Sequence, residues 1–405
     1  MFSPFNPHRM NPLIVFSCIV GCLLPFSAQA DEVHSDSFRI DGRLSGVPDG
    51  AAIRLKKIKG SLLVTVQTDT VRNGRFHLAD TLTGGAQNFC LTTDIKKAPN
   101  SWLDVWVAPG KHVTISGQGV CHPMWHVESD VPEQAYEARK LAAMLPEEQQ
   151  FLFLLGEENE CMMELYRHQN ADKGRAARLR QQIDSLSALV DPLEKVRMSK
   201  LIDFLGVMPV SEPWLRDYTL LVKDLDGEEA TTAARIRALY TCLPDSIRHT
   251  DRGRTLKAYI ELPPPLRVGD DYVDGDLYDT QGGLHHLSEF EGRYLLLDFW
   301  SQGCGPCLRA IPELQTLQEQ YADSLTVVSL SEDPKDLWQE YVSANALGGV
   351  QWNELRPDGT GLRGRYGVTG IPHFVLISPA GKLLESWSGY GKGVLNGKLA
   401  PHLRP

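Results

Sequence analysis

The chain is short of positive charge and of long hydrophobic runs. Its 405 residues include 41 Lys and Arg against 51 Asp and Glu, which gives a formal net charge of −10 at pH 7. Recognition of nucleic acid requires concentrated Lys and Arg, so nucleic acid is excluded as the main partner. After residue 30, no apolar run approaches the roughly 20 residues that a membrane-spanning helix needs. With 42% hydrophobic residues the chain has the composition of a folded protein, and its length predicts two or three domains.

The first 30 residues contain no Asp or Glu. An apolar run at positions 13–26 is followed by Ala-Gln-Ala at 28–30, a pattern typical of a secretory signal peptide. We therefore expect residues 1–30 to be a signal peptide and the mature protein to reside in the periplasm or cell envelope. Residues 19–22 (Ile-Val-Gly-Cys) also resemble a lipobox, and in this alternative Cys22 is lipidated and anchors the chain to a membrane.

Three regions of different composition follow the expected signal peptide. Residues 31–125 alternate polar and apolar stretches, and Asn73-Gly74 is a strong signal for a β-hairpin turn, so we predict an all-β, sandwich-like domain. Residues 126–262 are rich in Glu, Gln, Arg, Leu and Ala, which predicts an all-α helical domain. A proline run interrupts the helical pattern at the start of residues 263–405, where strands and helices then alternate. That alternation predicts an α/β domain with a mixed sheet and helices on its faces.

Four cysteines lie between the signal peptide and the C-terminal region: Cys90, Cys121, Cys161 and Cys242. An even number in an oxidising compartment predicts one or two structural disulfides, with the pairing left open. Residues 121–126 also gather Cys, Met and His side chains, which are ligands that suit copper. Because no spacing in this segment fixes a coordination geometry, we predict no metal site there.

The segment 298–307 carries the motif that indicates a chemical activity. Cys304 and Cys307 lie where a buried strand is expected to end and a helix to begin. At a helix N-terminus, unpaired backbone N–H groups and the helix dipole stabilise a thiolate, which is the nucleophile of thiol chemistry. The second cysteine lies most of a turn away and can resolve a mixed disulfide formed by the first. The motif therefore predicts thiol-disulfide exchange, in which Cys304 attacks and Cys307 resolves.

A zinc site and haem attachment are the chemical alternatives for a Cys-x-x-Cys motif. Zinc requires two further ligands, and the chain has no second Cys-x-x-Cys. Haem attachment needs a His directly after the second cysteine, where this chain has Leu308. We therefore predict neither a metal nor another cofactor at this motif.

The surroundings of the motif resemble the active site of the thioredoxin superfamily, and in particular its exported TlpA-like, AhpC/TSA-related branch of thiol-disulfide oxidoreductases. The resemblance rests on residues 295–312, on Leu-Ser-Glu-Phe-Glu-Gly at 287–292, and on Gly370-Ile371-Pro372 before a later strand. It extends from residue 266 to the end of the chain. It implies a C-terminal thioredoxin fold and a disulfide oxidoreductase activity.

The resemblance also implies a role for each matching residue. Cys304 matches the nucleophile of the family and Cys307 its resolving thiol. Pro372 matches the cis-proline of the family, and Ile371 matches the residue before it, whose backbone binds an extended substrate. Asp298 matches the buried acid that exchanges protons with the resolving cysteine, and a carboxylate held only by backbone groups is the alternative.

Four further positions bear on the substrate contacts. Trp300 is expected to pack beside the active site, and a plain core position is the equal alternative. Gly305 and Pro306, between the cysteines, are the pair found in reducing thioredoxins, which favours a disulfide reductase. Thioredoxins carry Trp immediately before the first cysteine, where this chain has Gly303, so a flat apolar contact for partner proteins is missing.

The sequence therefore predicts an exported protein disulfide oxidoreductase, with the reductase direction favoured. We expect its partners to be proteins with disulfides and a membrane thiol-electron donor, while the oligomeric state stays open. A disulfide oxidase or isomerase, a role in cytochrome c maturation, and a redox-sensing binding module of the cell envelope are the alternatives.

Overall fold

The computed structural model describes residues 36–96, 98–168, 173–223, 225, 229–356 and 360–403. The expected signal peptide at 1–30, with Cys22, lies outside the described residues. Within the ranges given, none of the helices combines the length and the apolar character that a membrane span requires.

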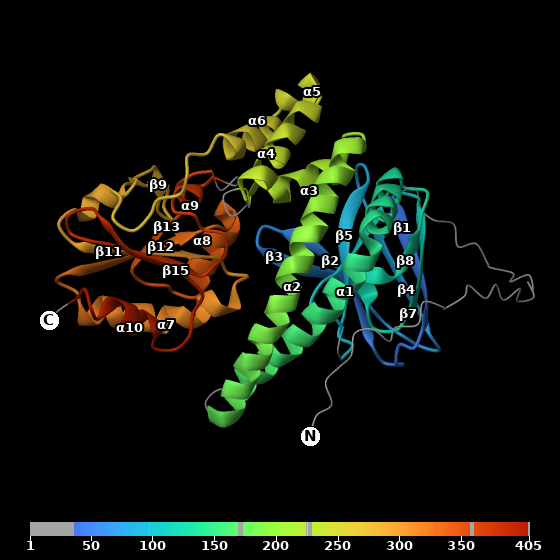
Figure 1. Cartoon of the computed structure of the whole chain (residues 1–405), viewed down its shortest axis with the longest axis horizontal. Coiled ribbons are helices and arrows are strands. Elements are labelled where there is room, and N and C mark those ends of the chain that lie inside the picture. Colours follow the sequence, from blue (N-terminus) through green and yellow to red (C-terminus); the bar gives the residue numbers. More distant parts are fainter. Residues whose placement is uncertain are drawn as a thin grey trace, which may run out of the picture.

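The N-terminal region is a sandwich of two four-stranded sheets, as predicted (Figure 1). In spatial order, one sheet contains β4 (Arg75–Thr81), β1 (Ser37–Ser45), β7 (His112–Gln118) and β8 (His126–Glu128). The other contains β3 (Leu62–Thr70), β2 (Ala52–Lys59), β5 (Gln87–Thr93) and β6 (Leu103–Val107). Alternate side chains such as Ile53 and Leu55 are fully buried, so the inner faces of the two sheets form one apolar core.

Asn73 and Gly74 form the predicted two-residue hairpin turn, with φ angles of 50° and 68°, and Arg72 and Arg75 pair across it by two backbone hydrogen bonds of 2.9 and 3.0 Å. Two details of this region differ from the prediction. The pairing stops at this one bridge, because β3 and β4 belong to different sheets. Val71, just before the turn, is fully buried. The chain therefore passes along the edge of the apolar core as it crosses from one sheet to the other. In addition, β8 pairs with β7 beyond residue 125, so the sheet extends past the expected boundary.

A helical region follows the sandwich. The long helices α1 (Pro132–His168) and α2 (Lys173–Val207) pack side by side (Figure 1). Shorter helices complete the region: α3 (Glu212–Lys223), α4 (Ala230–Leu239), η3 (Tyr240–Cys242), α5 (Asp245–Arg248) and α6 (Asp251–Ile260). Trp214 and Tyr218 are fully buried at the centre of their core.

A cluster of buried and partly buried charges joins the sandwich to the helical region. Arg216 on α3 donates to Glu137 on α1 at 2.7 Å and to Asp104 on β6 at 3.1 Å. Asp217 accepts from Arg216 at 3.0 Å and from Lys140 at 2.9 Å. The side chains of Glu137 and Asp217 are 8% and 5% exposed, so their negative charges depend on these two cations.

The C-terminal region contains a five-stranded mixed sheet. Its spatial order is β13 (Val350–Trp352), β12 (Leu325–Ser331), β11 (Tyr294–Trp300), β14 (His373–Ile377) and β15 (Leu383–Ser388). β11, β12 and β13 are parallel, whereas β14 and β15 are antiparallel to their neighbours. Helices α7 (Gly305–Gln320) and α10 (Val394–Leu399) cover one face of the sheet, and the short helix α9 (Leu362–Arg365) packs on the other (Figure 1). This is the predicted mixed sheet with helices on its faces.

The predicted disulfides among the remaining cysteines are wrong, because Cys90, Cys121, Cys161 and Cys242 are all free thiols. They lie on four different segments of the chain. Cys90 is buried in β5, and Cys161 is buried in a hydrophobic cluster of the helical region. Burial raises the pKa of Cys90 to about 12, so this thiol stays protonated and behaves as a small apolar side chain.

The His122 ring, in the segment that was considered for copper, is buried, and its Nε2 lies 2.9 Å from the carbonyl oxygen of Ser101.

The charge cluster gives a stability prediction. Arg216→Met should lower the free energy of unfolding by about 3 kcal/mol, because Glu137 and Asp217 lose one of their two cations while staying buried. Arg235→Met is the matched control, since Arg235 pairs with Asp203, whose side chain is 75% exposed, and should cost less than about 1 kcal/mol. Urea unfolding followed by circular dichroism measures both, and equal losses would contradict the assigned role of the cluster.

Candidate active site

The cysteine motif lies where the loop after β11 meets the start of α7. Six of the seven residues of β11 are buried, because the strand lies in the middle of the sheet with helices on its faces. The helix begins at Gly305, and Pro306 occupies a first-turn position, where a missing backbone N–H costs no hydrogen bond. Local sequence therefore fixes the site at which the strand ends and the helix starts.

The two sulfur atoms differ in their exposure. Cys304 and Cys307 form a disulfide, with Cys304 at the N-cap of α7. The Cys307 backbone N–H donates to the Cys304 Sγ at 3.2 Å. Cys307 is 2% exposed whereas Cys304 is half-buried, and Gly305 and Pro306 between them are exposed. A partner molecule can therefore approach Cys304 but not Cys307.

An aromatic cluster lies behind the disulfide. Trp300, which is 2% exposed, packs with Cys307 and Trp338, and its ring centroid lies 5.9 Å from that of Tyr341. This arrangement combines the two alternatives for Trp300, because the residue is both a core residue and a neighbour of the active site.

The segment before β14 contacts the same cluster. The Ile371–Pro372 peptide bond is cis, the geometry that the family resemblance implies for Pro372. Ile371 and Cys304 both pack against the cluster that contains Trp300 and Cys307, and Ile371 lies outside β14, which begins at His373. The ring of His373 is held between the hydroxyls of Ser388 and Ser386, at 2.8 and 3.0 Å, and burial lowers its pKa to about 4. A neutral His373 thus links β14 to β15 directly after the Ile371–Pro372 bond.

Asp298 is a buried acid on the face of β11 that α7 covers. Its neighbours two positions away, Leu296 and Trp300, both pack against residues of α7, and alternate residues of a strand share one face. The side chain is 3% exposed, and the Ser329 hydroxyl donates to Oδ2 at 3.2 Å, while Oδ1 has no hydrogen-bond partner among the described residues. Burial raises the pKa of Asp298 to about 7, although the Ser329 hydrogen bond opposes this shift. Asp298 can therefore take up and release a proton near neutral pH.

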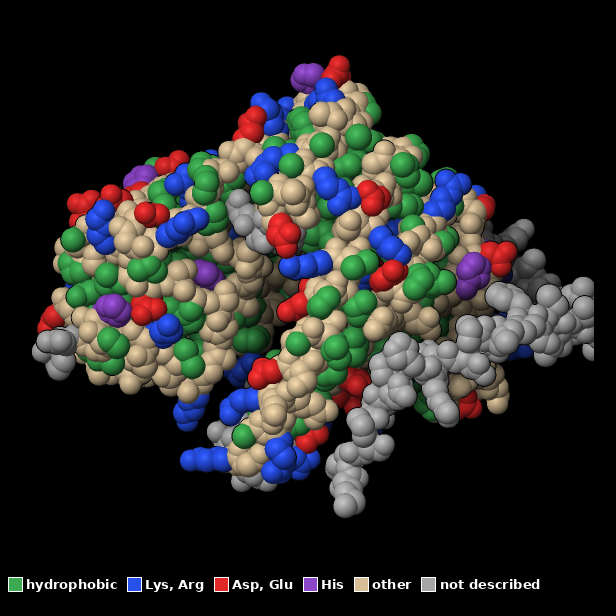
Figure 2. Space-filling view, viewed as in Figure 1, with side chains coloured by type: hydrophobic (Ala, Val, Ile, Leu, Met, Phe, Trp, Pro, Cys, Tyr) green, Lys and Arg blue, Asp and Glu red, His purple; other side chains and the backbone are tan. Residues whose placement is uncertain are grey.

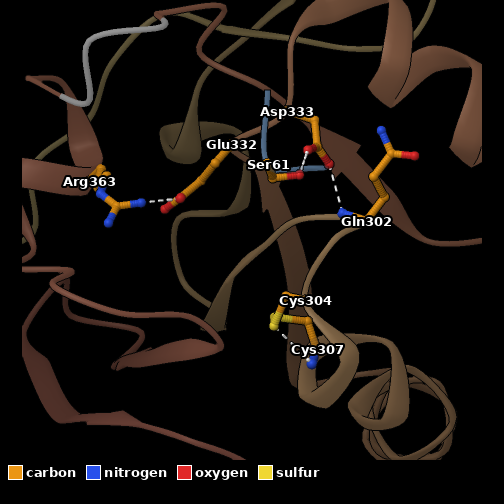
Figure 3. Close-up of a disulfide and its surroundings, with 7 residues drawn as sticks. All are labelled: Ser61, Gln302, Cys304, Cys307, Glu332, Asp333 and Arg363. Carbon is orange, nitrogen blue, oxygen red and sulfur yellow. Dashed lines mark hydrogen bonds and ion pairs between the residues drawn. A yellow bond between two sulfur atoms is a disulfide. The ribbon is translucent and has the colours of Figure 1, made fainter. Parts of the chain in front are cut away.

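Asp333 is a residue of the site that sequence reasoning missed. It follows β12 and is 3% exposed, and its Oδ2 accepts a hydrogen bond from the Gln302 backbone N–H at 2.7 Å. Its Oδ1 accepts a hydrogen bond from the hydroxyl of Ser61, which comes from the β-sandwich (Figure 3). The carboxyl ends of adjacent parallel strands meet at one sheet edge, and that rule could have placed Asp333 near Cys304. No local signal points to Ser61.

The neighbouring Glu332 forms an ion pair with Arg363 at the same edge (Figure 3). Burial raises the pKa of Glu332, and the adjacent Arg363 guanidinium counteracts that rise. This ion pair links the loop after β12 to helix α9.

Residues 292–383 match the model of the thioredoxin-like family. This region is a thioredoxin-like domain. The chain is 27% identical over 129 residues to the thioredoxin-like protein YneN of Bacillus subtilis. The matched segment covers 32% of this chain and 76% of YneN. It is 26% identical over 125 residues to the thiol-disulfide oxidoreductase ResA of Halalkalibacterium halodurans, covering 30% of this chain and 69% of that protein.

Among solved structures, a thiol-disulfide oxidoreductase from Bacteroides fragilis is 26% identical and is covered completely by 33% of this chain, with a TM-score of 0.31. The family match and the observed elements confirm the predicted fold class: a β-rich region and a helical region precede a thioredoxin-like domain. The family match includes Asp298, Cys304, Cys307 and Pro372 but not the two preceding regions.

The raised pKa of Asp298 gives a prediction about stability and pH. The folded state holds the Asp298 proton up to about pH 7, whereas an unfolded Asp loses it near pH 4, so Asp298 lowers the stability of the wild type as pH rises between these values. Asp298→Asn removes this dependence. The free energy of unfolding of the variant minus that of the wild type should therefore increase by about 3 kcal/mol from pH 5 to pH 8.

Urea titrations of the oxidised protein at both pH values measure this gain. Asp323→Asn, at an exposed position before β12, is the matched control and should show no such growth. A pH-independent difference for Asp298→Asn would show that the carboxyl group ionises normally.

Proposed function

We propose that this protein is an exported thiol-disulfide oxidoreductase that reduces disulfides of other proteins through Cys304 and Cys307. The observation that carries the proposal is the asymmetry of the disulfide, with an accessible sulfur at the N-cap of α7 and a buried sulfur one turn inside. The names of the relatives support the same chemistry, since ResA is a thiol-disulfide oxidoreductase.

The reaction is a pair of exchange steps. In the reduced enzyme the Cys304 thiolate attacks one sulfur of the substrate disulfide, which forms a mixed disulfide and releases the other substrate sulfur as a thiolate. Cys307 then loses its proton and attacks the Cys304 sulfur, which releases the second substrate thiolate. The enzyme keeps a Cys304–Cys307 disulfide, and two electrons have passed to the substrate.

The surrounding residues support these steps. Asp298, with its pKa near 7, serves as the base that accepts the proton of Cys307. The backbone of Ile371, fixed by Pro372, binds the substrate chain beside Cys304. Trp300 packs behind Cys307 and positions it. Gly305 and Pro306, which are small and exposed, leave Cys304 open to the substrate.

The location of the protein and its electron supply are also part of this proposal. A signal peptide at residues 1–30 directs the chain to the periplasm or cell envelope, with lipidation of Cys22 as the alternative. There the oxidised enzyme receives electrons from a membrane thiol-electron donor, and apocytochrome c is one candidate among its protein substrates.

The helical region ends by residue 262, and the catalytic region occupies residues 263–405.

Trapping of substrates tests the exchange mechanism. Cys307→Ser removes the resolving thiol, so we expect Cys304 to remain in mixed disulfides with substrate proteins, seen as bands that disappear on reduction. Because Cys242 is an exposed thiol, both variants are made in a Cys242→Ser background. The control Cys304→Ser should trap nothing, and equal trapping by the two variants would refute Cys304 as the nucleophile.

The reduction potential tests the direction of electron flow. Equilibration of the mature protein in dithiothreitol or glutathione buffers should give a value near about −270 mV, as for thioredoxin. A value near about −120 mV would identify a disulfide oxidase and reverse the proposed direction.

A further inference from the structure

The turn between β2 and β3 reaches from the β-sandwich to the active-site loop of the thioredoxin-like domain. Gly60 and Ser61 form this turn, and the Ser61 hydroxyl donates to one oxygen of Asp333. The other oxygen of Asp333 accepts from the Gln302 backbone N–H, two residues before Cys304. One buried carboxylate therefore connects the turn to the loop that carries the nucleophile (Figure 3).

Two glycines allow this close approach. A Cβ atom on Gly303 would lie 2.6 Å from the carbonyl oxygen of Ser61. A Cβ atom on Gly60, where φ is +59°, would lie 2.6 Å from the Cδ of Pro334. Both distances are far below a van der Waals contact, so no larger residue fits at either position while the turn is docked. The turn occupies the side of Cys304 where a Trp before the cysteine would otherwise lie.

A cleft of about 680 Å³ lies beside the docked turn, and its volume is within the range of ligand-binding sites. Ser61 of the sandwich, Tyr259 of the helical region and Ile371 of the thioredoxin-like domain all line it. In the space-filling view a recess separates the thioredoxin-like domain, on the left, from the long helices (Figure 2). Because the turn lies directly against Gly303, it blocks a broad flat protein surface from Cys304 on that side, and an extended chain needs less width to pass it.

The arms of the hairpin carry exposed apolar side chains next to the turn. Ile58 and Leu63 are 56% and 39% exposed and lie directly opposite each other in the β2–β3 register. Opposite residues of paired strands lie on one face, about 7 Å from the turn at the usual rise per residue. β3 is an edge strand of its sheet. An apolar pair on an edge hairpin, next to a turn that contacts Gly303, is a suitable surface for an apolar extended segment.

We propose that the β2–β3 hairpin is one wall of the substrate site, and that Ile58 and Leu63 bind apolar residues flanking the disulfide cysteine of an extended polypeptide. This inference rests on the proposed thiol-disulfide exchange at Cys304. The substrate class is thus an unfolded or extended apolar segment rather than the flat surface of a folded protein.

Three disulfide probes with the same leaving group test the inference. The first is a short peptide with a central cysteine flanked by Val and Leu, as a mixed disulfide with thionitrobenzoate. The second has Ser and Gly in the flanking positions, and the third is dithiobis(nitrobenzoate), without a peptide. The enzymes, all in a Cys242→Ser background, are reduced beforehand and then freed of dithiothreitol, because dithiothreitol would attack the probes directly. The Cys304 thiolate attacks the probe disulfide, and the coloured thionitrobenzoate released in this single turnover gives kcat/KM. The electrons come from the Cys304–Cys307 dithiol of the reduced enzyme.

Two variants and two matched controls are compared with the wild type. Ile58→Ser removes one apolar contact, and Leu284→Ser removes a similarly exposed aliphatic side chain, 53% exposed, from β10 (Leu284–His285). Gly60→Asn introduces a residue that tolerates positive φ, but the new side chain is forced against Pro334. Gly119→Asn makes the same change at a φ of +70°, where a Cβ meets nothing within 4 Å.

For each enzyme, the kcat/KM of a peptide probe is divided by the kcat/KM of dithiobis(nitrobenzoate). We expect Ile58→Ser and Gly60→Asn to lower this ratio about fivefold for the apolar peptide. The ratio for the polar peptide should fall much less in Ile58→Ser, and both controls should keep the wild-type ratios. Hydrogen–deuterium exchange of the turn amides should be faster in Gly60→Asn than in the wild type and the Gly119→Asn control, which reports undocking independently of activity.

Other outcomes overturn the inference. Unchanged ratios, or an equal fall for both peptides, would show that the hairpin does not contact the flanking residues. A rise for the apolar peptide in Gly60→Asn would show that the hairpin shields the site instead of binding substrate. Turnover of all probes by the wild type would leave the proposed function intact in these cases, whereas no turnover of any probe would refute both.

Discussion

The parallel pairing of β11 with β12 determines the sheet edge at which the functional groups around Cys304 meet. Parallel neighbours end at the same edge of the sheet, so the loop with Cys304 and the loop with Asp333 are brought together there. β14 runs antiparallel to β11, with His373 opposite Phe299, and therefore its first residues, next to Pro372, meet the same edge. Three segments that are remote in the sequence thus converge on one disulfide.

Burial of the same strand separates the chemical roles of the groups around the disulfide. The buried central strand keeps Asp298 away from solvent and thereby raises its pKa toward neutrality. The start of α7 leaves Cys304 accessible and turns Cys307 inward against Trp300. An exposed nucleophile, a covered second thiol and a nearby group that can exchange protons therefore follow from one strand-loop-helix unit.

Ion pairs and hydrogen bonds between partly or fully buried side chains connect the two regions ahead of the thioredoxin-like domain to each other and to that domain. Arg216 holds carboxylates from a strand and from two helices, so the sandwich and the helical region are locked together. That attachment gives the β2–β3 hairpin a defined position, from which Ser61 reaches Asp333. The sandwich is thereby a structural part of the active-site surroundings, and Gly303 leaves the space that the hairpin needs.

Several features of this protein follow from short-range patterns in its sequence. The alternation of strands and helices, the Cys-x-x-Cys at a helix start, and the Ile371-Pro372 pair could be predicted because each depends on residues close together in the chain. Which remote groups meet depends instead on the packing of the folded chain. The free state of Cys90 and Cys121, the crossing of the chain at Asn73-Gly74, and the contact between Ser61 and Asp333 depend on how separate elements pack. A hydrogen bond between residues 272 positions apart leaves no periodic trace in the sequence, because its partners are brought together only by the packing of one region against another.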